Sequence, residues 1–210
     1  MTKSPLLPLP DYQRIYQVLY SVLGASEIAV TNRSCIFFAA AGTMILREHY
    51  GLPATISVGC MALMVNEKQA RVAVYGRDEN GVFVNDQDAF HAWIECDGWL
   101  IDFMAPIMGE AFLEDGHDFD IPRNMLQKRL EARKTSMGEL HKTGDFFISG
   151  DAALAESLID SQPVQFSDLM RVCLAWYKKP PRPLKKLGMG DSQAATKILI
   201  ARAPSINGVW

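Results

Sequence analysis

The dipeptide Asp97-Gly98 constrains this chain more than any other feature of its sequence. It separates two apolar segments, residues 89–96 and 99–103, and Asp-Gly in such a setting is the strongest short-range indication of a two-residue β-hairpin. With Cys96 opposite Trp99, one face of the hairpin collects only apolar side chains, namely Phe90, Ala92, Ile94, Cys96, Trp99, Ile101 and Phe103. A slip of one residue would mix the two faces, so the pattern also determines the register.

The same register places a histidine near an aspartate on the opposite face. That face carries His91, Trp93, Glu95, Leu100, Asp102 and Met104. His91 lies opposite Met104, and Asp102 is its diagonal neighbour at roughly 7–8 Å between backbones, within reach of an imidazole–carboxylate hydrogen bond. A lone histidine on a strand is more often structural than catalytic, so the pair needs a third partner.

Cys35 is the candidate third partner. It opens the segment 35–46, which is apolar almost all the way round and therefore predicts a helix buried on most sides. Near the start of a helix, free N–H groups and the helix dipole favour a thiolate. Cys35 as nucleophile, His91 as base and Asp102 as the group that orients the imidazole form a candidate catalytic triad.

The remaining chain predicts further helices and strands. The apolar spacing predicts a helix over 11–23, and Gly51 followed by Pro53 ends the buried helix. We expect strands at 54–65 and 70–76 and a loop at 77–88. For the second half we expect a loop at 104–122, an exposed helix at 123–134, a strand or turn at 144–151, helices at 152–160 and 166–178, a basic Pro-rich break at 178–186 and a loop at 188–197.

Composition restricts the class of protein. Hydrophobic residues make up 49% of the 210 residues, enough for a sizeable core, and the net charge of −3 gives no reason to expect nucleic acid or an anionic membrane as partner. No apolar run reaches the roughly 18 residues of a membrane span, and the N-terminus lacks the pattern of a signal peptide, so we expect a cytoplasmic protein. The scattered cysteines and histidines contain no CxxC, HxxxH or HExxH, so we expect neither a disulfide framework nor a metal, and no cofactor.

The segments NRSC and HAWIECDGWLIDF resemble the core of the transglutaminase-like superfamily within the papain-like thiol enzymes. They are especially similar to bacterial transglutaminase-like peptidases that process lasso-peptide precursors. The resemblance covers about residues 30–106. It implies an α+β fold in which a buried helix bearing the cysteine packs on an antiparallel sheet, with Cys35, His91 and Asp102 in the roles given above. We therefore expect a catalytic core over 1–106 and a mostly helical C-terminal extension over 107–210, packed on the core and not independent.

This resemblance leaves the reaction open between related chemistries. A peptide or small amide could be hydrolysed through an acyl-enzyme, or an acyl group could be passed to an amine, as N-acetyltransferases and transglutaminases do with the same three residue types. A catalytically inactive binding module is the alternative from a different class. The oligomeric state is not encoded in these motifs.

Three neighbouring residues each have two interpretations. Related enzymes place a Gln before the cysteine to help hold the oxyanion, whereas this chain has Asn32, which could supply the amide donor or simply cap the helix. Trp93 could wall a substrate site or serve as a packing aromatic. Arg33 could meet a substrate carboxylate or be an ordinary surface arginine.

Overall fold

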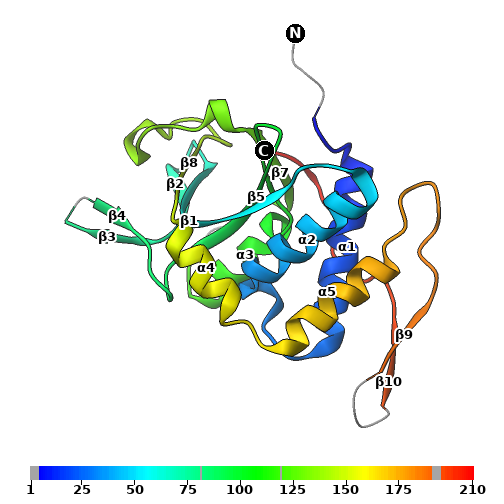
Figure 1. Ribbon diagram of the computed structural model, residues 1–210. Coiled ribbons are helices and arrows are strands. Elements are labelled where there is room, and N and C mark those ends of the chain that lie inside the picture. The colour runs from blue at the N-terminus through cyan, green and yellow to red at the C-terminus, as the bar shows by residue number, and fades with distance from the viewer. Residues whose placement is uncertain (1–4, 81, 119, 191–194) are drawn as a thin grey trace.

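The computed structural model describes residues 5–80, 82–118, 120–190 and 195–210. The fold is α+β: a mixed, mostly antiparallel sheet carries a layer of helices on one face (Figure 1). Within the described residues the main sheet has seven strands in the order β11-β7-β6-β5-β1-β2, and β8 pairs with β1 beside this path. Neighbouring strands are antiparallel except β11 and β7, which are parallel.

The elements have the following bounds. The main-sheet strands are β1 (Thr55–Asn66), β2 (Arg71–Tyr75), β5 (His91–Cys96), β6 (Trp99–Asp102), β7 (Asn124–Arg129), β8 (Phe146–Gly150) and β11 (Gly208–Val209). Two small hairpins are formed by β3 (Arg77–Glu79) with β4 (Val82–Val84), and by β9 (Leu187–Gly190) with β10 (Thr196–Leu199). The α-helices are α1 (Leu9–Ser26), α2 (Cys35–Tyr50), α3 (Met108–Glu114), α4 (Ala152–Asp160) and α5 (Val164–Trp176). Short 3-10 helices are η1 (Thr31–Arg33), η2 (Ala105–Ile107), η3 (Leu130–Ala132) and η4 (Met137–Glu139).

The β5–β6 hairpin has the predicted turn and register. Cys96 pairs with Trp99 and Ile94 with Ile101. Asp97 and Gly98 both have positive φ, 48° and 75°, as a two-residue turn that follows the strand twist requires. The predicted apolar face of the hairpin packs in one large core with side chains of α1, α2 and α5. The opposite face is buried too, in a second core to which Trp93, Leu100 and Met108 of α3 belong.

The first two helices confirm the sequence-based expectations. In α1 the predicted apolar face, which includes Tyr12 and Tyr16, is fully buried. In α2 nearly every residue from Cys35 to Leu46 is buried, and Gly51 ends the helix in the left-handed conformation with φ 66°. Ser34 is the N-cap residue, but its side chain makes no cap hydrogen bond and donates instead to the Val30 carbonyl oxygen, at 2.7 Å. The helix start is therefore not capped by Ser34.

One predicted helix is a strand. Residues 123–134 are rich in good helix formers, yet 124–129 form β7, which pairs with β6 from Trp99↔Arg129 to Asp102↔Leu126. Gln127 is buried, and its side-chain amide is satisfied there by two hydrogen bonds with the main chain of Leu7, at 2.9 and 3.0 Å. Long-range pairing and burial outweigh local helix propensity here.

Several expected loops contain regular structure. The segment 104–122 includes η2 and α3, because its apolar side chains close the second core. The segment 77–88 forms the β3–β4 hairpin, and 188–197 contributes to β9 and β10, although 191–194 lie outside the described residues. The strand at 144–151 and both later helices are present as β8, α4 and α5.

The two halves of the chain share one sheet. Residues 107–210 supply β7, β8 and β11 to the sheet that the first half begins, so this half is less helical than expected. No sheet boundary falls at residue 106, because β6 and β7 are direct neighbours. This shared sheet gives a physical reason for the second half not to be independent of the first.

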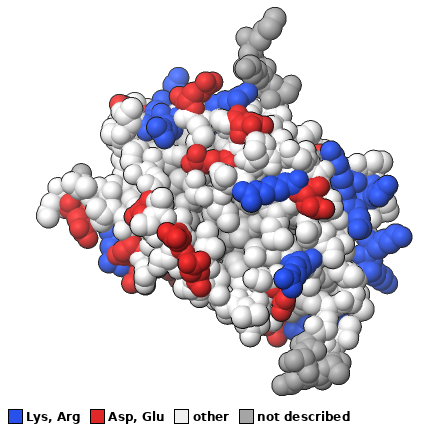
Figure 2. Space-filling model, viewed as in Figure 1, with Lys and Arg blue, Asp and Glu red and all other residues white. Residues whose placement is uncertain are grey.

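Charge is distributed unevenly over the surface. Figure 2 shows lysine and arginine side chains gathered along the edge where Figure 1 places the loop between α5 and β9, and the exposed residues of that loop include Lys178, Lys179, Arg182, Lys185 and Lys186. Among the helices of the described chain, none combines the length and apolar character needed to cross a membrane. The described residues also contain no group of three or more His, Cys, Asp or Glu side chains placed to hold a metal ion.

Candidate functional site

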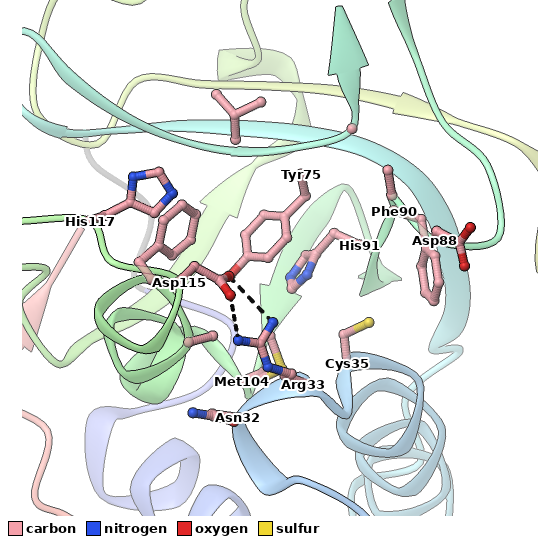
Figure 3. Close-up of a pocket in the computed structure, with 15 residues that line it drawn as sticks. Asn32, Arg33, Cys35, Tyr75, Asp88, Phe90, His91, Met104, Asp115 and His117 are labelled. Atoms are coloured by element: carbon pink, nitrogen blue, oxygen red, sulfur yellow. Dashed lines mark hydrogen bonds and ion pairs between the residues drawn. The ribbon is translucent and has the colours of Figure 1, made fainter.

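A pocket of about 380 Å³ opens where α2, β2, β5 and α3 meet. Cys35, Tyr75 and His91 line it together with other side chains from these elements. Figure 3 shows Cys35 at the start of α2 and His91 at the start of β5, with Tyr75 beside the imidazole. The pocket therefore contains two of the three residues predicted for the triad.

The third predicted residue, Asp102, is hydrogen-bonded to His91 from behind the pocket. His91 Nε2 lies 2.9 Å from Asp102 Oδ2, and both side chains are buried, with 0% and 2% exposure. Asp102 Oδ1 accepts a second hydrogen bond from the Met104 main-chain N–H, at 2.8 Å. The diagonal pairing expected from the hairpin register is thus present, and the carboxylate has a fixed orientation.

The other imidazole nitrogen faces a different environment. Within the described residues His91 Nδ1 is buried without a hydrogen bond of ordinary geometry. Burial by itself lowers the His91 pKa, but the charge and hydrogen bond of Asp102, with a smaller contribution from the Cys35 thiol, raise it to about 10. A proton on this imidazole is therefore favoured, and Cys35 lines the same pocket as the ring.

The remaining cysteines have a different setting. All four are free and buried, but Cys60, Cys96 and Cys173 are absent from the residues that line this pocket. Burial raises the pKa of each of these three thiols, with Asp151 and Asp97 adding to the effect at Cys60 and Cys96. Cys35 differs from them in lining the same pocket as the His91 imidazole.

Asn32 and Arg33 line the pocket but are engaged with acidic residues. Asn32 Nδ2 donates to Glu114 Oε1 at 3.0 Å, and its side chain extends away from Cys35 (Figure 3). Arg33 forms a two-point ion pair with Asp115, at 2.7 and 3.3 Å, which raises the Arg33 pKa and lowers that of Asp115. Neither expected role, oxyanion donor or carboxylate anchor, is supported by these contacts.

The expectation that Trp93 walls the pocket is wrong. Trp93 is 1% exposed, is not among the pocket-lining residues and belongs to the second core with Ile121 and Leu126. Its indole N–H donates to Glu95 Oε1 at 3.0 Å. Trp93 shares a strand face with His91 but does not reach the pocket. It lies two residues further along β5, where the segment after β6 covers that face. The alternative interpretation, a packing aromatic beneath the second half, holds.

Tyr75 is the site residue that the sequence did not indicate. Its ring stacks on the His91 imidazole, with centroids 4.3 Å apart and an interplanar angle of 26°. It comes from the end of β2, whose position depends on pairing with β1. A tyrosine at the end of a predicted strand carries no mark of this role in the sequence alone.

Comparison with known proteins shows the family. The model of the family described as a protein of unknown function, DUF2026, matches residues 8–210, so the chain belongs to this family. Its fold is similar to that of a crystal structure described as genomics APC5867, with a TM-score of 0.84 and 28% sequence identity over 99% of this chain and 98% of that one. Among curated proteins none matches the chain.

Proposed function

We propose that the chain is a cysteine-dependent hydrolase of amide bonds in a peptide or small amide, built on a papain- or transglutaminase-like core. The observation that carries the proposal is the buried His91–Asp102 hydrogen bond of 2.9 Å at a pocket that Cys35 also lines. Covalent acyl transfer requires a nucleophile, a base beside it and a third group that orients the base.

The start of α2 suits a thiolate. Cys35 is the first residue of the helix, and the Ser34 side chain leaves the N–H groups of the first turn without a side-chain cap. These groups and the helix dipole stabilise negative charge at this end of the helix. The imidazolium that His91 forms is stabilised in turn by the Asp102 carboxylate.

The proposed reaction has two halves. The Cys35 thiol proton passes to His91, the sulfur bonds to the substrate carbonyl carbon, and the carbonyl electron pair moves onto oxygen. When the carbonyl re-forms, the C–N bond breaks and the amine leaves with the proton from His91. Water then gives a proton to His91 and attacks the thioester, which releases the acid and returns the proton to Cys35. Transfer to an amine would share the first half and differ only in the second acceptor.

Selective alkylation tests the common first requirement. Iodoacetamide labelling near pH 6, with mass spectrometry of all four cysteines, should modify Cys35 at least about tenfold faster than the other three, because only a thiolate reacts readily at this pH. His91→Gln should remove this advantage. The matched control is His49→Gln. His49 belongs to α2, the helix that begins with Cys35, but it is not among the pocket-lining residues, and its Nε2 lies 3.4 Å from the Leu174 carbonyl oxygen.

Two results would refute the proposed function. One is uniformly slow labelling of the four cysteines in the folded wild type. The other is selective labelling of Cys35 that persists in His91→Gln, because the imidazole would then play no part in activating the thiol. Either result would favour the alternative of a binding module without catalysis.

A further inference from the structure

Tyr75 is held in one position at the wall of the pocket. One face of its ring stacks on His91 at 4.3 Å, and the ring of Phe112 meets it edge-on at 5.6 Å between centroids. These contacts from β5 and α3 restrict rotation of the tyrosine ring. Its hydroxyl therefore has a defined place in the site.

The Tyr75 hydroxyl is a buried polar group with nothing to bond. Within the described residues its oxygen is buried and makes no hydrogen bond, although the residue borders the pocket. Buried hydroxyl groups in folded proteins almost always have a partner, and an exception calls for an explanation such as a catalytic role. Because Tyr75 lines the pocket, a molecule bound there is a candidate partner for this hydroxyl.

The surroundings keep this hydroxyl protonated at a pocket that the candidate nucleophile also lines. Burial raises the Tyr75 pKa well above its ordinary value, and the charges of Asp102 and Cys35 raise it further. The group is thus a hydrogen-bond donor at any physiological pH. Tyr75 and Cys35 line the same pocket, so a substrate bound there would border both residues.

We infer that the Tyr75 hydroxyl donates a hydrogen bond to the carbonyl oxygen of the acyl group that Cys35 attacks. This role rests on the proposed function. As the sulfur–carbon bond forms, the carbonyl oxygen gains the electron pair, and a preorganised donor stabilises that charge. Tyr75 keeps its proton throughout. Asn32 is a poorer candidate for this task because its amide nitrogen already donates to Glu114.

Two reagents separate this role from effects on the thiol itself. Acylation of Cys35 by p-nitrophenyl acetate passes through an oxyanion and is followed by release of p-nitrophenol, whereas alkylation by iodoacetamide forms no oxyanion. Tyr75→Phe keeps the ring and its stacking. It should lower the rate of acylation by roughly 100-fold, the usual effect of losing one oxyanion donor, and leave alkylation within about twofold.

Two further variants complete the experiment. Tyr20→Phe is the matched control, since Tyr20 is a partly buried tyrosine of α1 that is not among the pocket-lining residues, and it should change neither rate. Tyr75→Leu, which also removes the stacked ring, should lower both rates because His91 loses its packing partner. The Phe variant should fold as the wild type does, because the hydroxyl has no internal hydrogen bond to lose.

The outcomes distinguish the two proposals. Selective alkylation of Cys35 in the wild type with unchanged acylation in Tyr75→Phe refutes the role of Tyr75 and leaves the proposed function standing. Equal losses of acylation and alkylation in Tyr75→Phe also refute it, because the hydroxyl would then act on the thiol. A wild-type Cys35 that reacts with neither reagent refutes the proposed function, and the role of Tyr75 with it.

Discussion

Asp102 combines three interactions that leave its carboxylate one orientation. Oδ2 is bonded to His91 Nε2 and Oδ1 to the Met104 main-chain N–H, while the main-chain oxygen of Asp102 accepts from the Tyr12 hydroxyl. Because Oδ2 accepts, His91 Nε2 carries a proton, and Nδ1 is the nitrogen available to Cys35. The protonation of the imidazole therefore depends on the carboxylate.

This dependence predicts a large effect of Asp102→Asn on the reactivity of Cys35. The new amide would keep its oxygen toward the Met104 N–H and turn its NH₂ toward Nε2, which would force the proton onto Nδ1. We expect iodoacetamide labelling of Cys35 near pH 6 to slow by at least roughly tenfold, since the base is then blocked and the imidazolium loses its counter-charge.

Asp115→Asn is the control for loss of one negative charge near the same pocket. Asp115 pairs with Arg33 and has no hydrogen bond to His91 among the described contacts. Its replacement should alter Cys35 labelling by no more than a few-fold. Equal effects of the two variants would mean that Asp102 acts only through net charge.

At the scale of elements, the contact between α2 and the β5–β6 hairpin depends on Gly42. A Cβ placed at this position would lie 2.6 Å from Phe103 Cδ2 and 2.9 Å from Ile94 Cδ1. The absence of a side chain therefore lets the helix approach the sheet closely. The helix carries Cys35 and the hairpin carries His91, so this packing contact also sets how the two candidate site residues are placed relative to each other.

Gly42→Ala should destabilise the protein although alanine is the better helix former. Overpacking against a ring edge costs about 1–3 kcal/mol, which exceeds the ~1 kcal/mol gained in helix propensity. Urea unfolding would measure the change. Gly24→Ala in α1 is the matched control, because a Cβ there meets only Thr31 Oγ1 at 3.8 Å and should be neutral or stabilising.

Labelling of Cys35 adds a second readout for this prediction. If the close approach of α2 sets the site, Gly42→Ala should slow alkylation of Cys35 as well as reduce stability, whereas Gly24→Ala should leave it unchanged. A Gly42→Ala protein as stable as the wild type would show that Phe103 and Ile94 can move aside at little cost.

At the scale of the whole molecule, the buried His91–Asp102 pair links stability to pH. The His91 pKa is raised in the folded protein from an ordinary 6.5 to about 10. The folded state therefore keeps a proton that the unfolded chain releases in this range. The contribution to stability is complete below pH 6.5 and is lost as pH rises toward 10, by up to about 1.4 kcal/mol per pH unit.

The pH dependence of stability is best measured in a protein without the Cys35 thiol. Proton transfer from Cys35 to His91 would otherwise leave the number of protons bound by the folded state unchanged. We expect the free energy of unfolding of Cys35→Ser, measured in urea between pH 6 and 9, to fall more steeply than that of Cys35→Ser combined with His91→Gln. Parallel curves for the two proteins would mean that His91 is neutral in the fold.

Features determined by residues close together in the sequence could be predicted from it, whereas features determined by contacts between distant segments could not. The hairpin turn, its register and the His91–Asp102 diagonal follow from a few adjacent residues, and the structure contains them. The strand β7 could not be recognised, because its residues favour a helix until β6 lies beside them. Tyr75 escaped notice for the same reason, since its place beside His91 results from the separate pairing of β2 and β5 with β1.

The wide spacing of the site residues along the chain has a consequence for folding kinetics. His91 and Asp102 belong to one local hairpin, a unit that can form within microseconds, whereas Cys35 reaches the imidazole only after α2 docks on the sheet. Contacts between distant segments form late because closing the intervening loop costs entropy first. The appearance of a fast-reacting thiol during refolding would therefore time the docking of α2, so one cysteine would report a long-range assembly step of the molecule.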